Sequence, residues 1–409
     1  MNRKLVGTTM CLAPLALAIA AFAVGYSAMH PAWWTAAVHL AVLGGITMMI
    51  YAVNIRIVPV FARRDWKSPH LLLAQIVTGL GGAWMVFLGT GMRWEWLERA
   101  GQLVALAGGV LFMLNVAQLF HQKVQMPPQT YRYELQAAVD KAATGFTRLS
   151  ATLLLVGLGI GVMLSWWRPG FGRWDLVWAH TMLVGWFMTM AAGVCYHMLS
   201  RWTGVPWRSL AMIRLHYRIV AVGLPFMLLA LAADWRWLFF VAGPLQAAAI
   251  VIFLINILPL VVRLVGPARV GILMAVVFLV IGVSLGVMFA IDTSTGPRLR
   301  QVHVMANLFG WAGLLISGFG YRFVPNFAGQ GLRWPWLAPL QLTVMVLGVA
   351  TGMYAMWDRM YNGGSTDAVV LASSIVGIGL LLFAIQVAGT FAGGRAERVQ
   401  LVMDVVPNH

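Results

Sequence analysis

The sequence has 409 residues, of which 61% are hydrophobic and only 10% are charged, and its mean hydropathy is +0.82. A soluble core cannot bury so large an apolar share, so this composition excludes a soluble globular protein and indicates a polytopic membrane protein. The net charge of +16 does not indicate nucleic-acid binding, because the basic residues lie scattered at the ends of apolar segments and form no basic run.

Twelve apolar segments are long enough to cross a bilayer, which takes about 20 residues per helix. The first follows Asn2, Arg3 and Lys4, and we interpret it as a membrane helix because its apolar run exceeds a signal-peptide core. The predicted helices lie near residues 5–27, 33–58, 70–91, 99–120, 146–166, 174–199, 213–233, 237–262, 269–290, 299–324, 335–356 and 368–391. The longest predicted connection is 121–145. We therefore predict an all-α polytopic fold of twelve transmembrane helices in a single domain, 1–409.

An internal repeat organises these segments. Residues 38–59, 179–204 and 300–329 follow the same pattern, and aligning Gly44, Gly185 and Gly310 brings Pro59, Ser200 and Pro325 together without a gap. A fixed repeat indicates repeated architecture. We predict three pseudo-symmetric four-helix units, near residues 1–135, 140–265 and 268–392.

Each copy of the repeat carries a histidine inside its apolar segment: His39, His180 and His303. An imidazole in hydrocarbon is costly unless it is paired, so three at matched depth favour metal or haem ligation over hydrogen bonds to neighbouring helices. In the third copy Met305 occupies the aligned position and His303 lies two residues earlier. A helix turns about 100° per residue, so these two side chains project about 200° apart and can serve two neighbouring sites.

Other potential ligands have simpler explanations. His70, His121, His197 and His216 fall at predicted cytoplasmic helix ends, although a second metal site between His197 and His216 remains an alternative. Cys11 and Cys195 are too far apart in sequence to form a Cys-x-x-Cys-His haem attachment. All twelve carboxylates fall in predicted loops or at helix ends, so the sequence predicts no buried acid of the kind that pumps and ion-coupled transporters use.

The basic residues are divided unequally between alternate loops. Eight of the 28 lie on one side (Arg93, Arg99, Arg168, Arg173, Arg236, Arg298, Arg300 and Arg359), and the other 20 lie on the side of both termini. The positive-inside rule therefore places both termini in the cytoplasm.

Twelve helices with histidines on helices 2, 6 and 10 resemble the catalytic subunit of haem–copper oxygen and nitric oxide reductases. The local similarity is to the high-affinity bacterial oxygen reductases, whose tenth helix has a His-Val-His…Gly-Trp run. This chain has His303-Val304-Met305…Gly310-Trp311 there. The resemblance implies one or two b-type haems and a place in the bacterial inner membrane.

The resemblance also implies roles for single residues. His303 matches the axial ligand of the high-spin haem, His39 matches a ligand of the low-spin haem, and Met305 replaces its second histidine. His180 matches a ligand of the active-site copper and would face the open position of the high-spin iron. Arg298 and Arg300, five and three residues before His303, are the nearest outer cations for haem propionates.

One departure from the family concerns copper. The adjacent histidine pair of helix 7 should fall at Leu229 to Asp234, where the chain reads LALAAD. A copper site normally has about three imidazole ligands, so copper binding and copper-dependent oxygen reduction are not expected. The chain is then similar to shorter relatives of the superfamily, including NnrS-type proteins associated with nitric oxide stress.

Two functions follow from this resemblance: handling of nitric oxide or another diatomic gas by an oxidoreductase, or transmembrane electron transfer. Electrons would come from quinol or a c-type cytochrome. The alternatives are a permease or a metal or haem carrier that uses the intramembrane histidines, and a structural subunit of a respiratory complex. The sequence gives no oligomeric state.

The charge asymmetry makes the orientation testable. Reporter fusions at Arg298 and after the last helix should give opposite answers, with the C-terminal fusion in the cytoplasm and the Arg298 fusion outside. Identical answers from the two fusions would contradict the predicted helix count or orientation.

Overall fold

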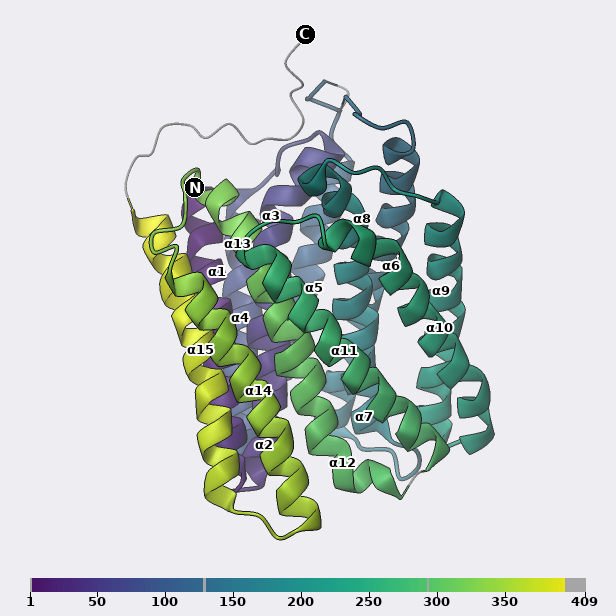
Figure 1. Cartoon of the computed structure of the whole chain (residues 1–409), viewed down its shortest axis with the longest axis vertical. Coiled ribbons are helices and arrows are strands. Elements are labelled where there is room, and N and C mark those ends of the chain that lie inside the picture. The colour runs from purple at the N-terminus through teal and green to yellow at the C-terminus, as the bar shows by residue number, and fades with distance from the viewer. Residues whose placement is uncertain (1, 128–129, 293, 394–409) are drawn as a thin grey trace. The chain divides into compact units, whose positions relative to one another are not determined.

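The computed structural model describes residues 2–127, 130–292 and 294–393, and within them every regular element is a helix (Figure 1). Twelve of its helices are long and apolar enough to cross a membrane, which confirms the predicted number. Three of the twelve are interrupted by a π-helical segment, in which each backbone N–H bonds to the carbonyl five residues earlier. The protein is therefore an all-helical, multi-pass membrane protein.

The helices divide into two compact units. The larger unit contains α1 to α5 and α11 to α15, and the smaller unit contains α6 to α10. In the larger unit the helices are α1 (Asn2–Ser27), α2 (Ala32–His39), η1 (Leu40–Thr47), α3 (Met48–Ala62), α4 (Pro69–Met92), α5 (Glu95–Phe120), α11 (Pro267–Ile291), α12 (Thr295–Val304), η3 (Met305–Gly313), α13 (Leu314–Ala328), α14 (Leu337–Tyr361) and α15 (Thr366–Ala392). In the smaller unit they are α6 (Gln136–Trp166), α7 (Trp174–His180), η2 (Thr181–Met188), α8 (Thr189–Thr203), α9 (Leu210–Ala233) and α10 (Arg236–Val261).

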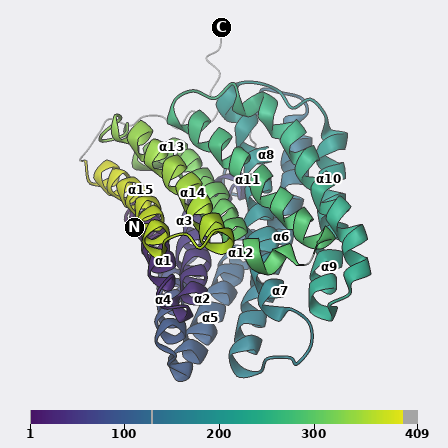
Figure 2. The same cartoon turned by 60° about the horizontal axis from the view of Figure 1, so that its bottom comes forward.

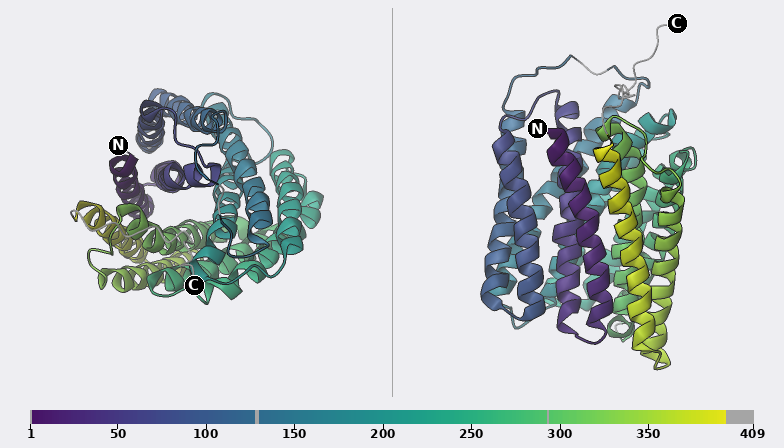
Figure 3. Two further views of the ribbon diagram at one scale, coloured as in Figure 1. Left: turned by 90° about the horizontal axis from the view of Figure 1, so that it is seen from above. Right: turned by 90° about the vertical axis from the view of Figure 1, so that its left-hand side faces the viewer.

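Within the larger unit, α4 packs along α5, and α15 packs along both α1 and α14 (Figure 3). The α2–η1–α3 helix contacts both α1 and α4. In the smaller unit, α9 and α10 form an antiparallel pair, and α6 packs along η2 and α8 (Figure 2).

The three interrupted helices are the most buried ones. In the apolar windows of α2–η1–α3, α7–η2–α8 and α12–η3–α13, 83%, 78% and 83% of the residues are buried, against at most 61% in any other span. They are not the most apolar spans, because their mean hydropathies of 1.9, 1.4 and 1.4 lie below the 2.8 of the span Pro267–Ile291. The predicted helices 2, 6 and 10 are thus the interior helices of their units.

Helix boundaries show the internal repeat more clearly than the sequence pattern does. The elements η1, α3, α4 and α5 have the same bounds as η2, α8, α9 and α10 when 141 is added to every residue number. The bounds of α8 become those of α13 when 125 is added. The three copies therefore share one backbone plan, interruption included.

Buried polar residues recur at the same repeat position. Gln75, His216 and Gln341 correspond under these offsets, and all three are buried. Asn115 donates to Gln75 Oε1 at 2.9 Å, and Tyr321 donates its hydroxyl to Gln341 Oε1 at 2.8 Å. The equivalent group in the smaller unit joins His216, Tyr196 and Asn256.

His216 is the imidazole partner of Tyr196 in this group. The Asn256 amide donates to the Tyr196 hydroxyl at 3.3 Å, and His216 Nδ1 lies 2.8 Å from the same hydroxyl oxygen. A hydroxyl can donate one hydrogen bond and accept two, so either tautomer of His216 satisfies this contact. His216 thus pairs with a buried tyrosine, as Gln341 does with Tyr321.

One helix differs from the prediction. The segment 121–145 was predicted to be a connection, but α6 begins at Gln136, ten residues before the predicted start at 146. Hydropathy misses the first turns because they carry Asp140 and Lys141. Their apolar face nevertheless continues at helical spacing through Val139, Ala143 and Phe146, all of which are buried.

Replacing His216 tests the shared polar position. His216→Gln should leave the thermal stability of the detergent-solubilised protein near that of the wild type, because glutamine accepts from tyrosine at position 341. His216→Leu leaves the buried Tyr196 hydroxyl without its imidazole partner and should cost about 1–3 kcal/mol.

Thermal unfolding of both variants measures this difference. Gln341→Leu is the matched variant in the third repeat, because it removes the hydrogen-bond partner of Tyr321. Equal stability of the two His216 variants would contradict the assignment.

Candidate functional site

Two of the three predicted histidines lie at a junction between α-helix and π-helix. His39 ends α2 immediately before η1, and His180 ends α7 immediately before η2. His303 lies two residues before η3, and the residue at that junction is Met305. Short π segments inside α-helices are frequent at functional sites. The repeat therefore places His39, His180 and Met305 where the helix changes its hydrogen-bond register, with His303 two residues earlier.

His303 is held by the neighbouring helix α11. Its Nδ1 lies 2.9 Å from the carbonyl oxygen of Gly282, and its ring packs at a tilt against Phe289 with 5.4 Å between ring centroids. A carbonyl oxygen only accepts, so Nδ1 carries the proton and Nε2 carries the lone pair. This is the tautomer in which a histidine ligates through Nε2 while a backbone carbonyl fixes the ring.

His180 has the same tautomer by a different route. Its Nδ1 donates to the carbonyl oxygen of Leu176, one turn earlier in its own helix, at 2.8 Å. Its Nε2 is therefore the nitrogen with the lone pair. His180 lies in the smaller unit, and the other predicted histidines lie in the larger one.

Met305 projects away from His303. Its side chain is 1% exposed and packs against Gly352 of α14, where a methyl group on the glycine would come within 3.0 Å of Met305 Cε. His303 contacts α11 instead. The predicted divergence of these two side chains toward different neighbours is confirmed, while ligation of iron by Met305 remains a prediction.

The two predicted propionate-binding residues have surface positions. Arg298 and Arg300 lie in α12 and are exposed, whereas Leu299 between them is buried. Cationic side chains that reach solvent at the start of a membrane helix can meet carboxylates or lipid headgroups. Their role toward haem remains a prediction.

The residues present fit ligation through an imidazole nitrogen. The tautomers of His303 and His180 leave Nε2 as the donor nitrogen, as a haem or metal ligand requires. In the described part of the chain, no three His, Cys, Asp or Glu side chains gather into a metal site. The LALAAD stretch forms the end of α9, and Asp234 there ends the helix in a left-handed conformation and pairs with Arg173 at 3.0 Å.

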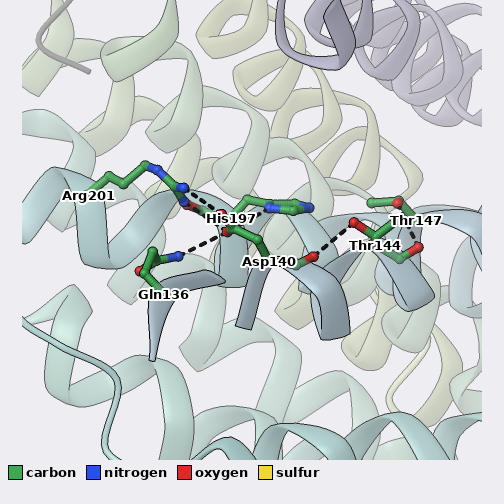
Figure 4. A network of polar contacts seen from close by, with 6 residues as sticks. All are labelled: Gln136, Asp140, Thr144, Thr147, His197 and Arg201. Carbon is green, nitrogen blue, oxygen red and sulfur yellow. Dashed lines mark hydrogen bonds and ion pairs between the residues drawn. The ribbon is translucent and has the colours of Figure 1, made fainter. Parts of the chain in front are cut away.

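A buried acid that the sequence reading missed lies in the smaller unit (Figure 4). The side chain of Asp140 is 10% exposed, and Arg201 of α8 binds both its oxygens, at 3.0 and 2.6 Å. His197 Nδ1 and Gln136 Nε2 lie 3.1 and 3.0 Å from the same carboxylate. Asp140 lies near the start of α6, but the expectation that the chain has no buried acid is wrong.

This group, Gln136, Asp140, His197 and Arg201, fastens α6 to α8. The arginine neutralises the carboxylate, which is the usual condition for burying a charge. His197 points its Nδ1 to Asp140, and His216 points its Nδ1 to Tyr196, so each histidine already serves a protein partner. Both histidines are buried and bind these partners through Nδ1, as His303 and His180 do, so the second metal site considered for His197 and His216 remains a prediction.

Comparison with known proteins shows which solved structures have a similar fold. A solved heme-copper terminal oxidase matches with a TM-score of 0.70 at 12% sequence identity, over 98% of this chain and 86% of that chain. The fold resembles that of a haem–copper terminal oxidase. At 12% identity this similarity concerns the fold alone. No family model matches the sequence, and no curated protein matches it significantly.

The Asp140 group generates a stability prediction. Asp140→Ala leaves the buried Arg201 guanidinium without its counter-ion, and such a loss costs about 3–5 kcal/mol. The double variant Asp140→Leu with Arg201→Met removes both charges and should recover most of that loss, because apolar replacement of a buried pair is often neutral.

Apparent melting temperatures of the two variants in one detergent measure this difference. A double variant no more stable than Asp140→Ala would show that the pair does more than satisfy its own charges.

Proposed function

We propose that this protein binds haem b through His303 and handles a diatomic gas, nitric oxide above all, without the copper-dependent reduction of oxygen. The observation that carries the proposal is the hydrogen bond from His303 Nδ1 to the Gly282 carbonyl, on an interior helix of an oxidase-like fold. A reduced haem with one histidine ligand supplies an iron that can bind nitric oxide or carbon monoxide.

The protein's own residues give that iron its surroundings in this proposal. Nε2 of His303 would ligate the haem iron, and the Gly282 carbonyl keeps the ring in one orientation. Phe289 and the aliphatic residues of α11 around it keep the site apolar. Arg298 and Arg300 are the cations proposed to pair with haem propionates.

A second haem is proposed at His39. His39 is half-buried at the end of α2, one residue before η1, in the unit that also contains Met305. Methionine as the partner ligand would raise the reduction potential of that iron. The electron donor is proposed to be quinol or a c-type cytochrome, and the location is proposed to be the bacterial inner membrane with both termini in the cytoplasm.

The limit on oxygen chemistry rests on the residues of α9. The stretch from Leu229 to Asp234 contributes no imidazole, so His180 is the only family copper ligand that the chain retains at an aligned position. A single histidine does not hold copper against competing ligands in the way that about three do. Nitric oxide binding at a haem needs no copper, which is why it is the preferred function.

A permease or carrier is the main alternative, and Asp140 removes one argument against it. Transporters use buried acids that change their charge state. Asp140, however, is bound on both oxygens by Arg201, which holds it in its ionised form. The haem reading therefore remains preferred.

The test is the visible spectrum of the purified protein. We expect a b-type spectrum in the dithionite-reduced form, and a shift on addition of nitric oxide or carbon monoxide. His303→Ala should abolish that shift, and His39→Ala should remove a different part of the spectrum. His70→Ala is the matched control, because His70 is exposed at the start of α4.

Each outcome separates the readings. If the protein has a haem spectrum that responds to neither gas, its function is electron transfer. If the protein contains no haem, it is a carrier or a structural subunit. Oxygen consumption by a copper-containing preparation would contradict the interpretation of α9.

A further inference from the structure

Asn307 lies one helical turn after His303, inside η3. Its Nδ2 donates to the carbonyl oxygen of His303 at 2.9 Å. A π segment shifts the backbone hydrogen-bond register by one residue, so the carbonyls just before it lose their α-helical partners. The Asn307 side chain supplies a donor at this junction, and it does so on the residue that carries the proposed ligand.

The same amide is pressed against Gly282. A methyl group on Gly282 would lie 2.5 Å from Asn307 Cγ, so a side chain at this position would force the amide to move. The Gly282 carbonyl in turn accepts from His303 Nδ1 at 2.9 Å, and Asn307 Nδ2 lies 3.4 Å from that nitrogen. The asparagine therefore touches both the acceptor residue and the imidazole.

This arrangement belongs to the third repeat alone. In the alignment on the repeat glycines, the positions equivalent to Asn307 are Ala41 and Met182. Neither residue can donate a hydrogen bond from its side chain. An amide needed only for the shared backbone plan would be expected in all three copies. Asn307 is instead found only in the copy whose histidine, His303, lies two residues before the aligned position.

We propose that Asn307 is a positioning residue for His303. By packing against Gly282 and donating to the His303 carbonyl, it holds the imidazole against the Gly282 carbonyl. It makes no hydrogen bond to the protonated Nδ1, because its amide nitrogen is itself a donor. In this position Nδ1 donates to Gly282 and Nε2 keeps the lone pair for iron. The inference rests on the proposed function in its reference to haem, while the tautomer of His303 is a property of the chain itself. Outer partners of this kind fix the orientation of a ligating histidine and raise its basicity.

Two variants and one control test the proposal. Asn307→Leu removes the amide at similar volume, and Asn307→Asp keeps the shape but places a carboxylate near Nδ1. Asn115→Leu is the control, because Asn115 is also a buried asparagine of the larger unit, bonded to Gln75. It should cost stability without affecting His303.

The first measurement needs no haem. In protein labelled with ¹⁵N-histidine, with the His303 signal assigned through His303→Gln, the wild type and Asn115→Leu should show protonated Nδ1 and unprotonated Nε2. Asn307→Leu should lose this single tautomer and give a mixture. An unchanged His303 signal in Asn307→Leu overturns the positioning role whatever the protein binds.

The second measurement is the iron–histidine stretching vibration of the reduced protein in resonance Raman spectra. Asn307→Asp should raise its frequency, because a carboxylate draws the Nδ1 proton and strengthens Nε2 as a donor. Asn307→Leu should lower or broaden it. Equal frequencies in all variants overturn the proposal, whereas a wild type without haem but with the expected tautomer overturns the proposed function alone.

Discussion

Polar groups inside this protein must find their partners within the chain, because lipid offers no hydrogen-bond donors or acceptors. The π segments make that constraint acute, since each disturbs the bonding of an interior helix. In the smaller unit, Ser150 donates to the Trp186 carbonyl at 2.6 Å and Thr189 to the Val184 carbonyl at 3.0 Å. In the larger unit Asn307 does the same for His303. In these two repeats the disturbed turns are thus stabilised by different side chains.

The repeat shows a constant backbone with changing side chains. Helix boundaries match under fixed offsets, yet the buried polar position holds Gln75, His216 or Gln341. Asp140 has no counterpart, because the equivalent position in the third copy is Val265. The buried polar and charged side chains therefore differ between the copies, although the helix boundaries do not.

Hydropathy alone predicted the twelve helices, because a membrane-spanning helix requires little more than about 20 apolar residues. It did not show the start of α6, where burial depends on Arg201 reaching Asp140 from another helix. Nor did it show the π segments, whose residues are as apolar as those of the adjoining α-helix. The opposite directions of His303 and Met305 followed from helical geometry alone. The partner of His303 did not, because a glycine carbonyl has no signature in sequence.

The two histidines with defined tautomers differ in what fixes them. His180 bonds to a carbonyl of its own helix, so its ring orientation moves with that helix. His303 bonds to α11, so its orientation depends on the packing of two helices. That packing is close, since a methyl group on Gly310 would lie 2.6 Å from Phe278, and one on Gly271 2.8 Å from the Gly318 backbone. Small residues let membrane helices approach in this way, and here the approach holds the Gly282 carbonyl within reach of the imidazole.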